Sequence, residues 1–293
     1  MGDFRVIKIL KSTRHRLLKL IGQQKSEKII TFSAKWLGVD LLSAAYHQRG
    51  ILKYGNHDVS GESHVINTIL NSYFSDQEIV IFDVGANIGN YTKELKQAFP
   101  KSKIYAFEPN HNAFQTLEQE LNDTDIERFC VGLSSHVSSK KGYTYASDDK
   151  SEHASVYKEV LTDLHQAKEI IEIVFETISL DCFCEQHEIK EIDFLKIDTE
   201  GHELEVLSGG KEMITQGNIK IIQFEFNEMN IVSRVFLKDF YQILSDYDIY
   251  RLDSNRLIPL ADYNSENEIF KFQNFLAIRK SVQKYLETSS ISN

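Results

Sequence analysis

Hydrophobic residues are concentrated in four short runs, and each run is followed by a segment with helical periodicity. The runs are Ile79–Val84, Lys103–Glu108, Ile192–Ile197 and Ile219–Phe226. Short, nearly continuous apolar runs are typical of strands that are buried on both faces of a parallel sheet. The helical segments after them are Tyr91–Phe99, Asn112–Leu121, His202–Ile214 and Leu237–Leu244. This alternation predicts an α/β fold, a doubly wound sheet with helices on both faces.

Weaker patterns complete the predicted domain. Glu127–Leu133 is predicted to be the third strand, 179–187 a helix, and Asp248–Leu252 and Asn274–Ile278 an antiparallel addition at the end of the sheet. Gly142–Glu176 is the least regular stretch, with expected strands at Tyr143–Ala146 and Ile171–Phe175 and a helix at Val156–Ala167. Because insertions at the carboxyl edge of such a sheet carry specificity, we assign this one to the acceptor side.

The first 75 residues form a predicted helical extension. Asp3–Ile21 has an apolar side and a basic side, so this helix can lie on an anionic membrane, pack on its own domain or pack on a second subunit. We favour packing. A second helix, Glu27–Gln48, is expected to bury Trp36, Leu37, Leu41 and Leu42, and a third, His64–Phe74, leads into the first strand. The predicted organisation is an extension (1–75), a catalytic domain (76–280) and a tail (281–293).

The charge is unevenly distributed along the chain. Residues 1–36 hold nine lysines and arginines and two acidic residues, whereas the remainder holds 24 basic and 41 acidic residues. An acidic body without a basic groove is a poor nucleic-acid binder. Three cysteines without a C-x-x-C pair favour a reducing compartment, and no apolar run is long enough for a membrane span. We therefore expect a cytoplasmic protein, with peripheral membrane contact through the N-terminal helix as the open alternative.

A glycine-rich turn follows the first strand, in the pattern D-x-G-x-N-x-G. Asp83 is the last residue but one of the strand, and Gly85, Asn87 and Gly89 belong to the turn before the helix. Glycines let a ligand approach the backbone, and the first N–H groups of the helix point toward that ligand. The dinucleotide fingerprint G-x-G-x-x-G is absent, because positions 87 and 90 are asparagine. The turn therefore favours a nucleoside ligand, with an ordinary strand–helix turn as the alternative.

Glu108 ends the second strand, about twenty-five residues after the glycine turn. At this position of a doubly wound sheet, an acidic side chain can accept hydrogen bonds from both ribose hydroxyls. Strand ends often carry solvated acids, so Glu108 alone is weak evidence. Together with the turn at Gly85 it supports a nucleoside site.

Three segments resemble one known family. FDVGANIGNYT, YAFEPN and FLKIDTEGHELEVLSGG (residues 194–210) are similar to the FkbM family of S-adenosylmethionine-dependent methyltransferases, and the likeness runs from Ile79 to Arg279. It implies a Rossmann-like class I methyltransferase sheet with S-adenosyl-L-methionine as cofactor. The residues it implies for cofactor binding are Asp83, Gly85, Asn87, Gly89, Glu108, Ser134 and Asp198. Many related enzymes carry an acid near Ser134 to bind the adenine amino group, so this contact stays open.

Candidate catalytic residues follow the fourth strand. Asp198, Glu200 and His202 are expected at the same sheet edge as Gly85 and Glu108. We assign Asp198 to positioning the acceptor, Glu200 to shaping the pocket or capping the turn, and His202 to the base, because imidazole titrates near neutrality. The alternative is that Asp198 and Glu200 bind Mg²⁺ with Glu225 or Glu228. Nothing in the spacing requires a metal, so we favour a metal-free site.

Three functions remain open at this stage. The leading prediction is O-methyl transfer to a hydroxyl of a sugar, glycan or glycolipid, since related enzymes act on hydroxyls of sugars and polyketide-type products. The second is an NAD-dependent oxidoreductase, which the missing fingerprint disfavours. The third is a non-catalytic binding module with the same fold, against which the intact acidic and glycine positions argue. The residues do not identify the acceptor.

Overall fold

The computed structural model describes residues 22–122, 125–145 and 154–282. The chain divides into two compact units, Met1–Gln48 and Arg49–Asn293, which we call the N-terminal segment and the sheet domain. The predicted helix Asp3–Ile21 and almost all of the predicted tail lie outside the described residues. No helix in the described ranges is both long and apolar enough to cross a bilayer.

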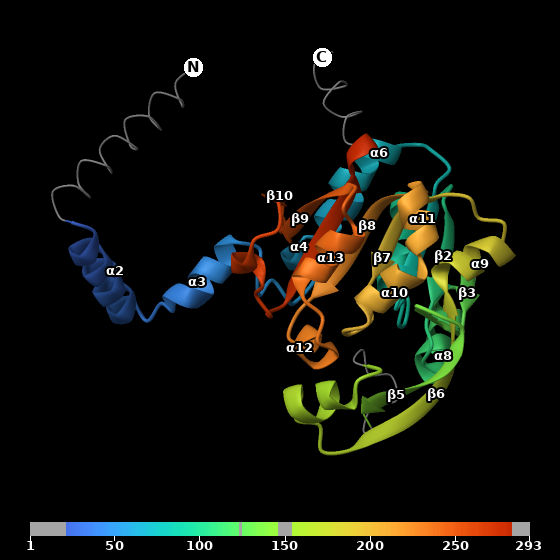
Figure 1. Ribbon diagram of the computed structural model, residues 1–293, viewed down its shortest axis with the longest axis horizontal. Coiled ribbons are helices and arrows are strands. Elements are labelled where there is room, and N and C mark those ends of the chain that lie inside the picture. The colour runs from blue at the N-terminus through green and yellow to red at the C-terminus, as the bar shows by residue number, and fades with distance from the viewer. Residues whose placement is uncertain (1–21, 123–124, 146–153, 283–293) are drawn as a thin grey trace, which may run out of the picture. The chain divides into compact units, whose positions relative to one another are not determined.

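The sheet domain is built on an eight-stranded sheet with the order β10-β9-β11-β8-β7-β1-β2-β3. Strands β3, β2, β1, β7 and β8 are parallel, whereas β11 runs antiparallel to both β8 and β9, and β10 antiparallel to β9. The strands are β1 (Val80–Val84), β2 (Lys103–Phe107), β3 (Glu127–Phe129), β7 (Ile192–Ile197), β8 (Ile219–Phe226), β9 (Tyr247–Asp253), β10 (Arg256–Leu260) and β11 (Gln273–Arg279). The predicted doubly wound sheet with an antiparallel addition is confirmed (Figure 1). Strand β10 was not predicted.

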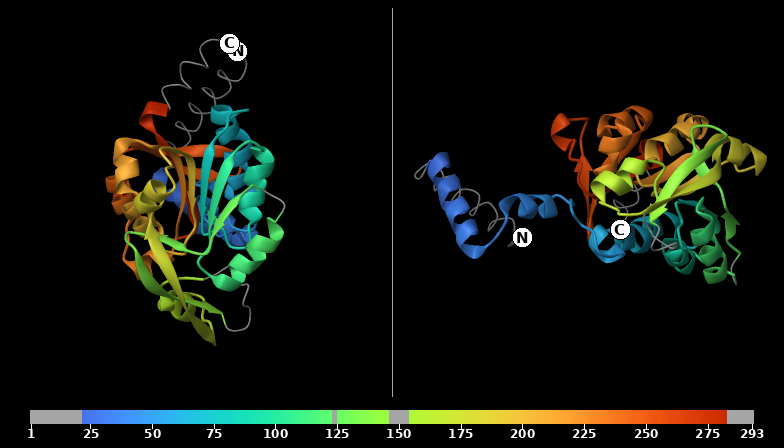
Figure 2. Two further views of the ribbon diagram at one scale, coloured as in Figure 1. Left: turned by 90° about the vertical axis from the view of Figure 1, so that its right-hand side faces the viewer. Right: turned by 90° about the horizontal axis from the view of Figure 1, so that it is seen from below.

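Side chains that alternate along the parallel strands divide the core into two layers. Phe82 and Val84 of β1 belong to one buried cluster and Ile81 to the other, because successive strand residues point to opposite faces. The first cluster includes residues of α9 (Leu180–Gln186), α10 (Glu203–Gly209), α11 (Lys211–Gln216) and α13 (Leu237–Ile243). The second includes residues of η1 (Val65–Leu70), α6 (Asn71–Phe74), α7 (Asn90–Ala98) and α8 (His111–Glu120). Figure 2 shows these two groups of helices on opposite faces of the sheet.

A second sheet carries most of the irregular insertion. Its order is β4-β6-β5, with β4 (Gly132–Ser134), β5 (Ser138–Tyr145) and β6 (Ile170–Ser179). The predicted single strand Glu127–Leu133 is therefore wrong: its first half pairs with β2 in the main sheet, and its second half pairs with β6. The predicted helix Val156–Ala167 is also shorter, because its regular part is η2 (Val160–Leu164) and Ser155 bridges to Tyr143.

Two predicted helices are interrupted at glycines. The predicted helix His202–Ile214 divides into α10 and α11 at Gly210, and a Cβ on Gly209, the last residue of α10, would lie 2.0 Å from the backbone oxygen of Ser134. The glycine therefore permits a close approach of α10 to β4. The predicted helix Glu27–Gln48 divides into α2 (Gln23–Leu37) and α3 (Leu41–Gln48), because Gly38 has the left-handed conformation that ends a helix.

The expected buried side of that N-terminal helix is wrong. Trp36, Leu37, Leu41 and Leu42 are all exposed, and Trp36 most of all at 79%. Residues 49–74 belong instead to the sheet domain, where short helices α4 (His57–Ser60) and α5 (Glu62–His64) precede η1 and α6. The remaining helices are α12 (Met229–Ser233) and η3 (Ser265–Asn267).

Candidate active site

A cavity of about 670 Å³ opens where the parallel strands end. Its lining includes residues 85–88 after β1, 107–110 at the end of β2, 198–200 after β7 and 227–229 after β8. The second sheet contributes the opposite wall, with Gly132, Leu133, Gly142, Tyr143, Ile173 and Phe175. The carboxyl edge of an open α/β sheet is where ligands bind in this class of fold. The insertion therefore forms one wall of the cavity, and the strand ends of the main sheet form another.

Gly85 allows the ends of two central strands to touch. Its φ is +80°, and a Cβ there would lie 1.8 Å from the backbone oxygen of Asp198. The amide of Asp198 donates in turn to the oxygen of Val84 at 3.0 Å. A side chain at position 85 would therefore separate the turn after β1 from the turn after β7. The sequence suggested room for a ligand at this glycine, and the structure shows that its first contact is with the chain itself.

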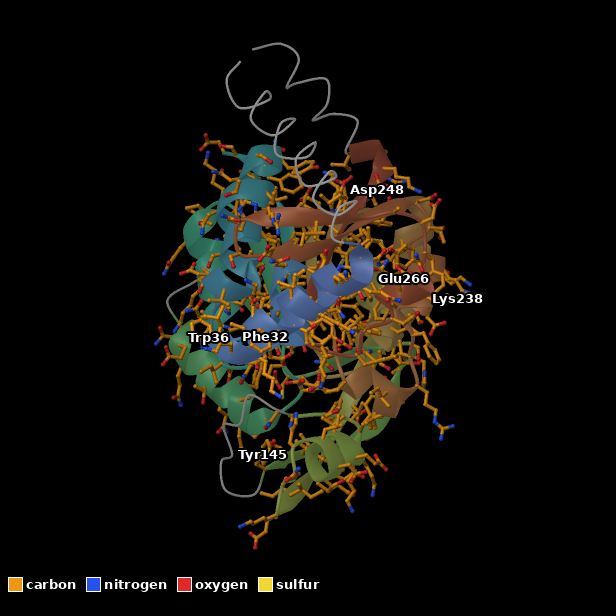
Figure 3. The ribbon with its side chains drawn as sticks, turned by 90° about the vertical axis from the view of Figure 1, so that its left-hand side faces the viewer. Phe32, Trp36, Tyr145, Lys238, Asp248 and Glu266 are labelled. Carbon is orange, nitrogen blue, oxygen red and sulfur yellow. The ribbon has the colours of Figure 1, made fainter. Side chains whose placement is uncertain are left out.

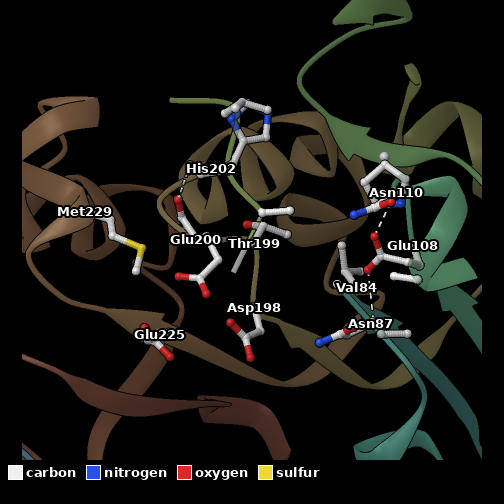
Figure 4. A pocket seen from close by; sticks show the side chains of 18 of the residues that line it. Val84, Asn87, Glu108, Asn110, Asp198, Thr199, Glu200, His202, Glu225 and Met229 are labelled. Carbon is white, nitrogen blue, oxygen red and sulfur yellow. Dashed lines mark hydrogen bonds between the residues drawn. The ribbon is translucent and has the colours of Figure 1, made fainter. Parts of the chain in front are cut away.

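Glu108 lies on the side of the cavity formed by the turns after β1 and β2, which we call the cofactor side because the sequence predicts the cofactor there (Figure 4). Its Oε2 accepts from the amide of Asn87 at 2.9 Å, and its Oε1 accepts from the amide of Asn110 at 2.7 Å. Burial raises the pKa of Glu108 to about 7, although these two amides and Lys196 favour the ionised form. Asn87 Oδ1 and Asn110 Nδ2 are buried polar atoms without a hydrogen-bond partner among the described residues. Acceptor oxygens of Glu108 and Asn87 and a donor nitrogen of Asn110 thus occur together on this side of the cavity.

Lys196 links the two central turns from inside the sheet. Its Nζ lies 3.5 Å from Asp83 Oδ1 and 3.2 Å from Asp198 Oδ2, and 5.2 Å from the centre of the Tyr91 ring. Burial opposes the charge of Lys196, but Asp198, Asp83 and Glu62 more than offset it, so its pKa lies above the ordinary value. Asp83 is fully buried and also accepts from the Thr92 hydroxyl at 2.6 Å. Asp83 therefore holds Lys196 from a buried position that does not line the cavity.

Three carboxylates gather on the other side of the cavity. Figure 4 shows Asp198, Glu200 and Glu225 around one space beside Met229, and we call this space the acidic hollow. Burial raises the pKa of Glu225 well above its usual range, and the nearby Asp198 and Glu200 raise it further. Glu225 Oε1 also accepts from the side-chain amide of Asn227. The crowding of like charges favours a proton or a cationic group in this hollow.

Glu203 holds the turn that carries Asp198 and Glu200. Its Oε1 accepts from the amide of Thr199 at 2.9 Å, from the Thr199 hydroxyl at 3.1 Å and from the amide of Gly201 at 3.2 Å. Glu200 itself has a φ of +55°, a conformation that costs energy in a residue with a side chain. These three hydrogen bonds, which Glu203 accepts, stabilise the tight turn. Sequence reasoning did not assign this role to Glu203, although the acid in the quoted segment EGHE could have suggested a cap.

His202 is buried in the wall between the acidic hollow and the second sheet. Its Nε2 lies 3.0 Å from the Ser134 hydroxyl, while its Nδ1 has no partner among the described residues. Burial and, to a smaller extent, the nearby Lys140 lower the pKa of His202 to about 4, so the imidazole is neutral at pH 7. Ser134 is fully buried and its hydroxyl contacts His202; it is not among the residues that line the cavity.

The structure brings most of the sequence-predicted site residues to one cavity. Those that line it are Gly85, Asn87, Glu108, Asp198, Glu200 and His202, whereas Asp83, Gly89 and Ser134 stand behind the wall. Sequence reasoning gave no role to Lys196, which lies in the quoted segment FLKIDTEGHE, and weighed Glu225 only as a metal ligand. In the described part of the chain, no three His, Cys, Asp or Glu side chains are arranged to hold a metal ion.

Comparisons with known proteins identify the family of this chain. The model of the methyltransferase FkbM domain matches residues 83–248, more than half of the chain. The fold and the match define a class I, S-adenosylmethionine-dependent methyltransferase. Within that class, the chain belongs to the FkbM methyltransferase family. The oxidoreductase alternative is therefore set aside.

The curated relatives are distant and only partly covered. The chain is 29% identical over 166 residues to the hexuronic acid methyltransferase AglP of Haloferax volcanii, over 57% of this chain and 63% of that protein. It is 28% identical over 166 residues to the 2-O-methyltransferase NoeI of Sinorhizobium fredii, over 52% of this chain and 65% of that protein. A solved FkbM methyltransferase from Methylobacillus flagellatus has 15% identity and a TM-score of 0.42, covering 80% of this chain and 57% of that chain.

The cofactor side has the groups that S-adenosylmethionine requires. Glu108 has acceptor capacity beyond its two amide bonds, because a carboxylate offers about four lone-pair sites. The orphaned Asn87 Oδ1 and Asn110 Nδ2 lie on either side of it in sequence and both residues line the cavity. A ribose diol and an adenine ring supply the donors and acceptors that these atoms lack. The residues present therefore fit the cofactor.

Proposed function

We propose that this enzyme transfers a methyl group to a hydroxyl of a sugar, glycan or glycolipid, and that the acidic hollow receives that hydroxyl. The observation that carries the proposal is the position of Asp198, Glu200 and Glu225 opposite the cofactor side of one cavity. A weakly acidic hydroxyl needs an acceptor for its proton, and the carboxylates of the hollow can supply one. The names of two relatives, which methylate a hexuronic acid and a 2-hydroxyl group, point to the same chemistry.

Asp198 is the first candidate to orient the acceptor. Lys196 contacts its Oδ2, which fixes the carboxylate, and Oδ1 is the oxygen not held by that contact. We assign to Oδ1 the hydrogen bond from the acceptor hydroxyl. S-adenosylmethionine supplies the methyl group on a sulfonium, which leaves as a neutral thioether when the C–S bond breaks and the O–C bond forms. The proton of the hydroxyl passes to the carboxylates of the hollow.

Glu200 and His202 have different parts in this proposal. Glu200 shapes the hollow, since its side chain faces Asp198 and Glu225 (Figure 4). His202 as the base stays a prediction. Burial lowers the pKa of His202 to about 4 and its Nε2 is already engaged by the Ser134 hydroxyl, whereas Asp198 faces the hollow, so we place Asp198 before it. No step in the proposal requires a metal.

The charge of the hollow narrows the range of sugars that can act as acceptor. Three acidic side chains face it, and Lys196 is already engaged by Asp83 and Asp198. A carboxylate-bearing sugar would meet like charges at a buried site, whereas a neutral or an amino sugar would not. We therefore propose an uncharged or amine-bearing sugar ring as the acceptor, in contrast to the hexuronic acid in the name of the archaeal relative.

Mass spectrometry tests this function. A pool of neutral, amino and uronic-acid glycans is incubated with S-adenosylmethionine that carries an isotope-labelled methyl group. We expect label on an oxygen of a neutral or amino sugar, and none with the Asp198→Asn enzyme. Label on nitrogen or carbon would contradict O-methyl transfer, and preferential labelling of the uronic acids would contradict the charge argument alone.

A further inference from the structure

Helix α2 of the N-terminal segment has an uncovered apolar side. Ile29, Phe32 and Trp36 recur at intervals of three and four residues, which places them on one side of a helix. They are 56%, 74% and 79% exposed. Phe32 and Trp36 are labelled in Figure 3. Single exposed apolar residues are ordinary, but a continuous side of this size on one helix marks an interaction surface.

The same surface widens at the end of α2 and the start of α3. Ile30 and Leu37 lie beside the stripe and are 56% and 65% exposed, and Leu42 follows at 59%. Gly38 turns the chain between the two helices in the left-handed conformation. We call Ile29, Ile30, Phe32, Trp36 and Leu37 the α2 apolar face.

Basic side chains border one edge of this face, where Lys28 and Lys35 lie. Lys25, Lys28 and Lys35 lie on α2, with Glu27 as its acidic residue. The whole N-terminal segment carries nine lysines and arginines against three acidic residues, whereas residues 49–293 carry 24 against 40. An aromatic and aliphatic side bordered by lysines is the composition of helices that lie in the plane of a membrane interface. A second copy of the segment would bring like charges together, so the charge favours an anionic surface.

We propose that the α2 apolar face docks on a membrane surface that contains anionic lipid. Phe32 and Trp36 enter the boundary between headgroups and acyl chains, where aromatic side chains are favoured, while Lys28 and Lys35 face the lipid phosphates. The interaction is independent of the proposed acceptor, because it involves no residue of the cavity. It would place the enzyme where lipid-linked substrates are found.

The chain provides its own probe, because Trp36 is its single tryptophan. The full chain is mixed with vesicles of phosphatidylcholine alone, or of phosphatidylcholine with one-third phosphatidylglycerol. We expect the Trp36 emission to shift to shorter wavelength and the protein to cosediment only with the anionic vesicles. Raising the salt from 0.1 to 0.5 M should reduce cosedimentation several-fold, because salt screens the lysine–phosphate attraction. Emission that is identical with and without anionic vesicles would overturn the proposal.

Two variants locate the contact, and both retain Trp36. Phe32→Asp should lower cosedimentation about tenfold or more by placing a charge in the apolar face. Lys28→Glu/Lys35→Glu should remove the preference for anionic lipid while the face stays apolar. Val137→Asp is the matched control, since Val137 is 65% exposed in the sheet domain and should bind vesicles like the wild type. Binding of S-adenosylmethionine, measured by calorimetry, verifies that each variant is folded.

Two other occupants of the face are distinguishable in the same experiments. If a second copy covers it, sedimentation will show a dimer and the Trp36 emission will depend on protein concentration without vesicles. If the sheet domain covers it, the Trp36 emission will already be shifted in dilute protein and Phe32→Asp will lower the melting temperature. Either result, or vesicle binding that Phe32→Asp leaves unchanged, would overturn the membrane proposal.

Discussion

The two sides of the cavity are built by different means. On the cofactor side, Glu108 is held by two backbone amides, and Gly85 lies directly against the backbone of the neighbouring turn. On the proposed acceptor side, the groups that gather are side chains: Asp198, Glu200 and Glu225 face one space, and the buried Lys196 contacts Asp198. Backbone contacts tolerate little change, whereas a side-chain cluster can be altered residue by residue. The comparison suggests that cofactor binding depends on local backbone geometry and acceptor chemistry on charge.

The largest expected effect comes from Gly85→Ala. A Cβ at this position overlaps the oxygen of Asp198, and the φ of +80° adds strain, so both turns must move. Left-handed strain and overpacking together cost about 2–5 kcal/mol of unfolding free energy. Denaturant unfolding should show this loss, with cofactor binding weakened as well.

Gly55→Ala is the matched control for this strain. Gly55 has a φ of +133°, and a Cβ there meets nothing within 4 Å. We expect it to lose only the smaller cost of the unusual φ. Equal stability of the two variants would show that the contact between the turns is unimportant.

Asp198→Asn should affect turnover more than cofactor affinity. The amide keeps the shape of the side chain but removes the charge that we assign to orienting and deprotonating the acceptor. We expect kcat to fall about 10²-fold or more, with a much smaller change in the dissociation constant of S-adenosylmethionine. Glu228→Gln, which removes a charge from the same cavity outside the hollow, is the control. Undiminished turnover at saturating acceptor would refute the role of Asp198.

Glu108→Gln should affect cofactor affinity more than turnover. A charge-assisted hydrogen bond contributes about 1.5–3 kcal/mol, so cofactor affinity should fall about 10–100-fold while the rate at saturation changes little. Because the pKa of Glu108 lies at about 7, the acid is partly protonated at neutral pH. In the wild type, affinity should therefore rise as the pH increases from 6 to 8, and calorimetry of the Gln variant should show a flat profile. The same slope in both enzymes would assign the titration to another group.

The smallest expected effect is that of a chelator. The described residues present no metal-ligating group of three side chains, and the acidic hollow has Lys196 beside it as a cation. Turnover after dialysis against EDTA should stay within twofold of the untreated enzyme. If activity is lost and Mg²⁺ restores it, the hollow binds a metal, and the charge comparison between the two sides must be revised.

Patterns with a single physical cause could be predicted from the sequence. The parallel strands follow from continuous apolar runs, and the positions of Gly85, Glu108 and Asp198 at one edge follow from strand polarity. The division of residues 127–133 between two sheets could not be predicted, because both halves have the same local character and only tertiary pairing distinguishes them. The same holds for the close approach of Gly209 to Ser134, because the neighbour that requires a glycine is seventy-five residues away in sequence.

Site chemistry was predictable in position more than in detail. The acids after the fourth strand were found because they end a strand, but the lysine within that strand looked like one interruption of an apolar run. The structure explains the buried charge of Lys196, because its ammonium group contacts both Asp83 and Asp198. The sequence predicts His202 as the catalytic base because an ordinary imidazole titrates near neutrality. In the structure, burial beside Ser134 lowers the pKa of His202 to about 4. Burial is a tertiary property that the spacing of residues does not contain.

The separate sheet of the insertion offers a route to redesign. Among the described residues, strands β4, β6 and β5 form a sheet that shares no strand with the main sheet, so their hydrogen-bond ladder is separate from that of the main sheet. Their inward residues Tyr143, Ile173 and Phe175 nevertheless form a wall of the same cavity. An engineer could exchange this wall for that of another methyltransferase, or randomise its three side chains, without touching Gly85, Glu108 or Asp198. Selection from such a library would change which molecule is methylated while the donor machinery is inherited intact.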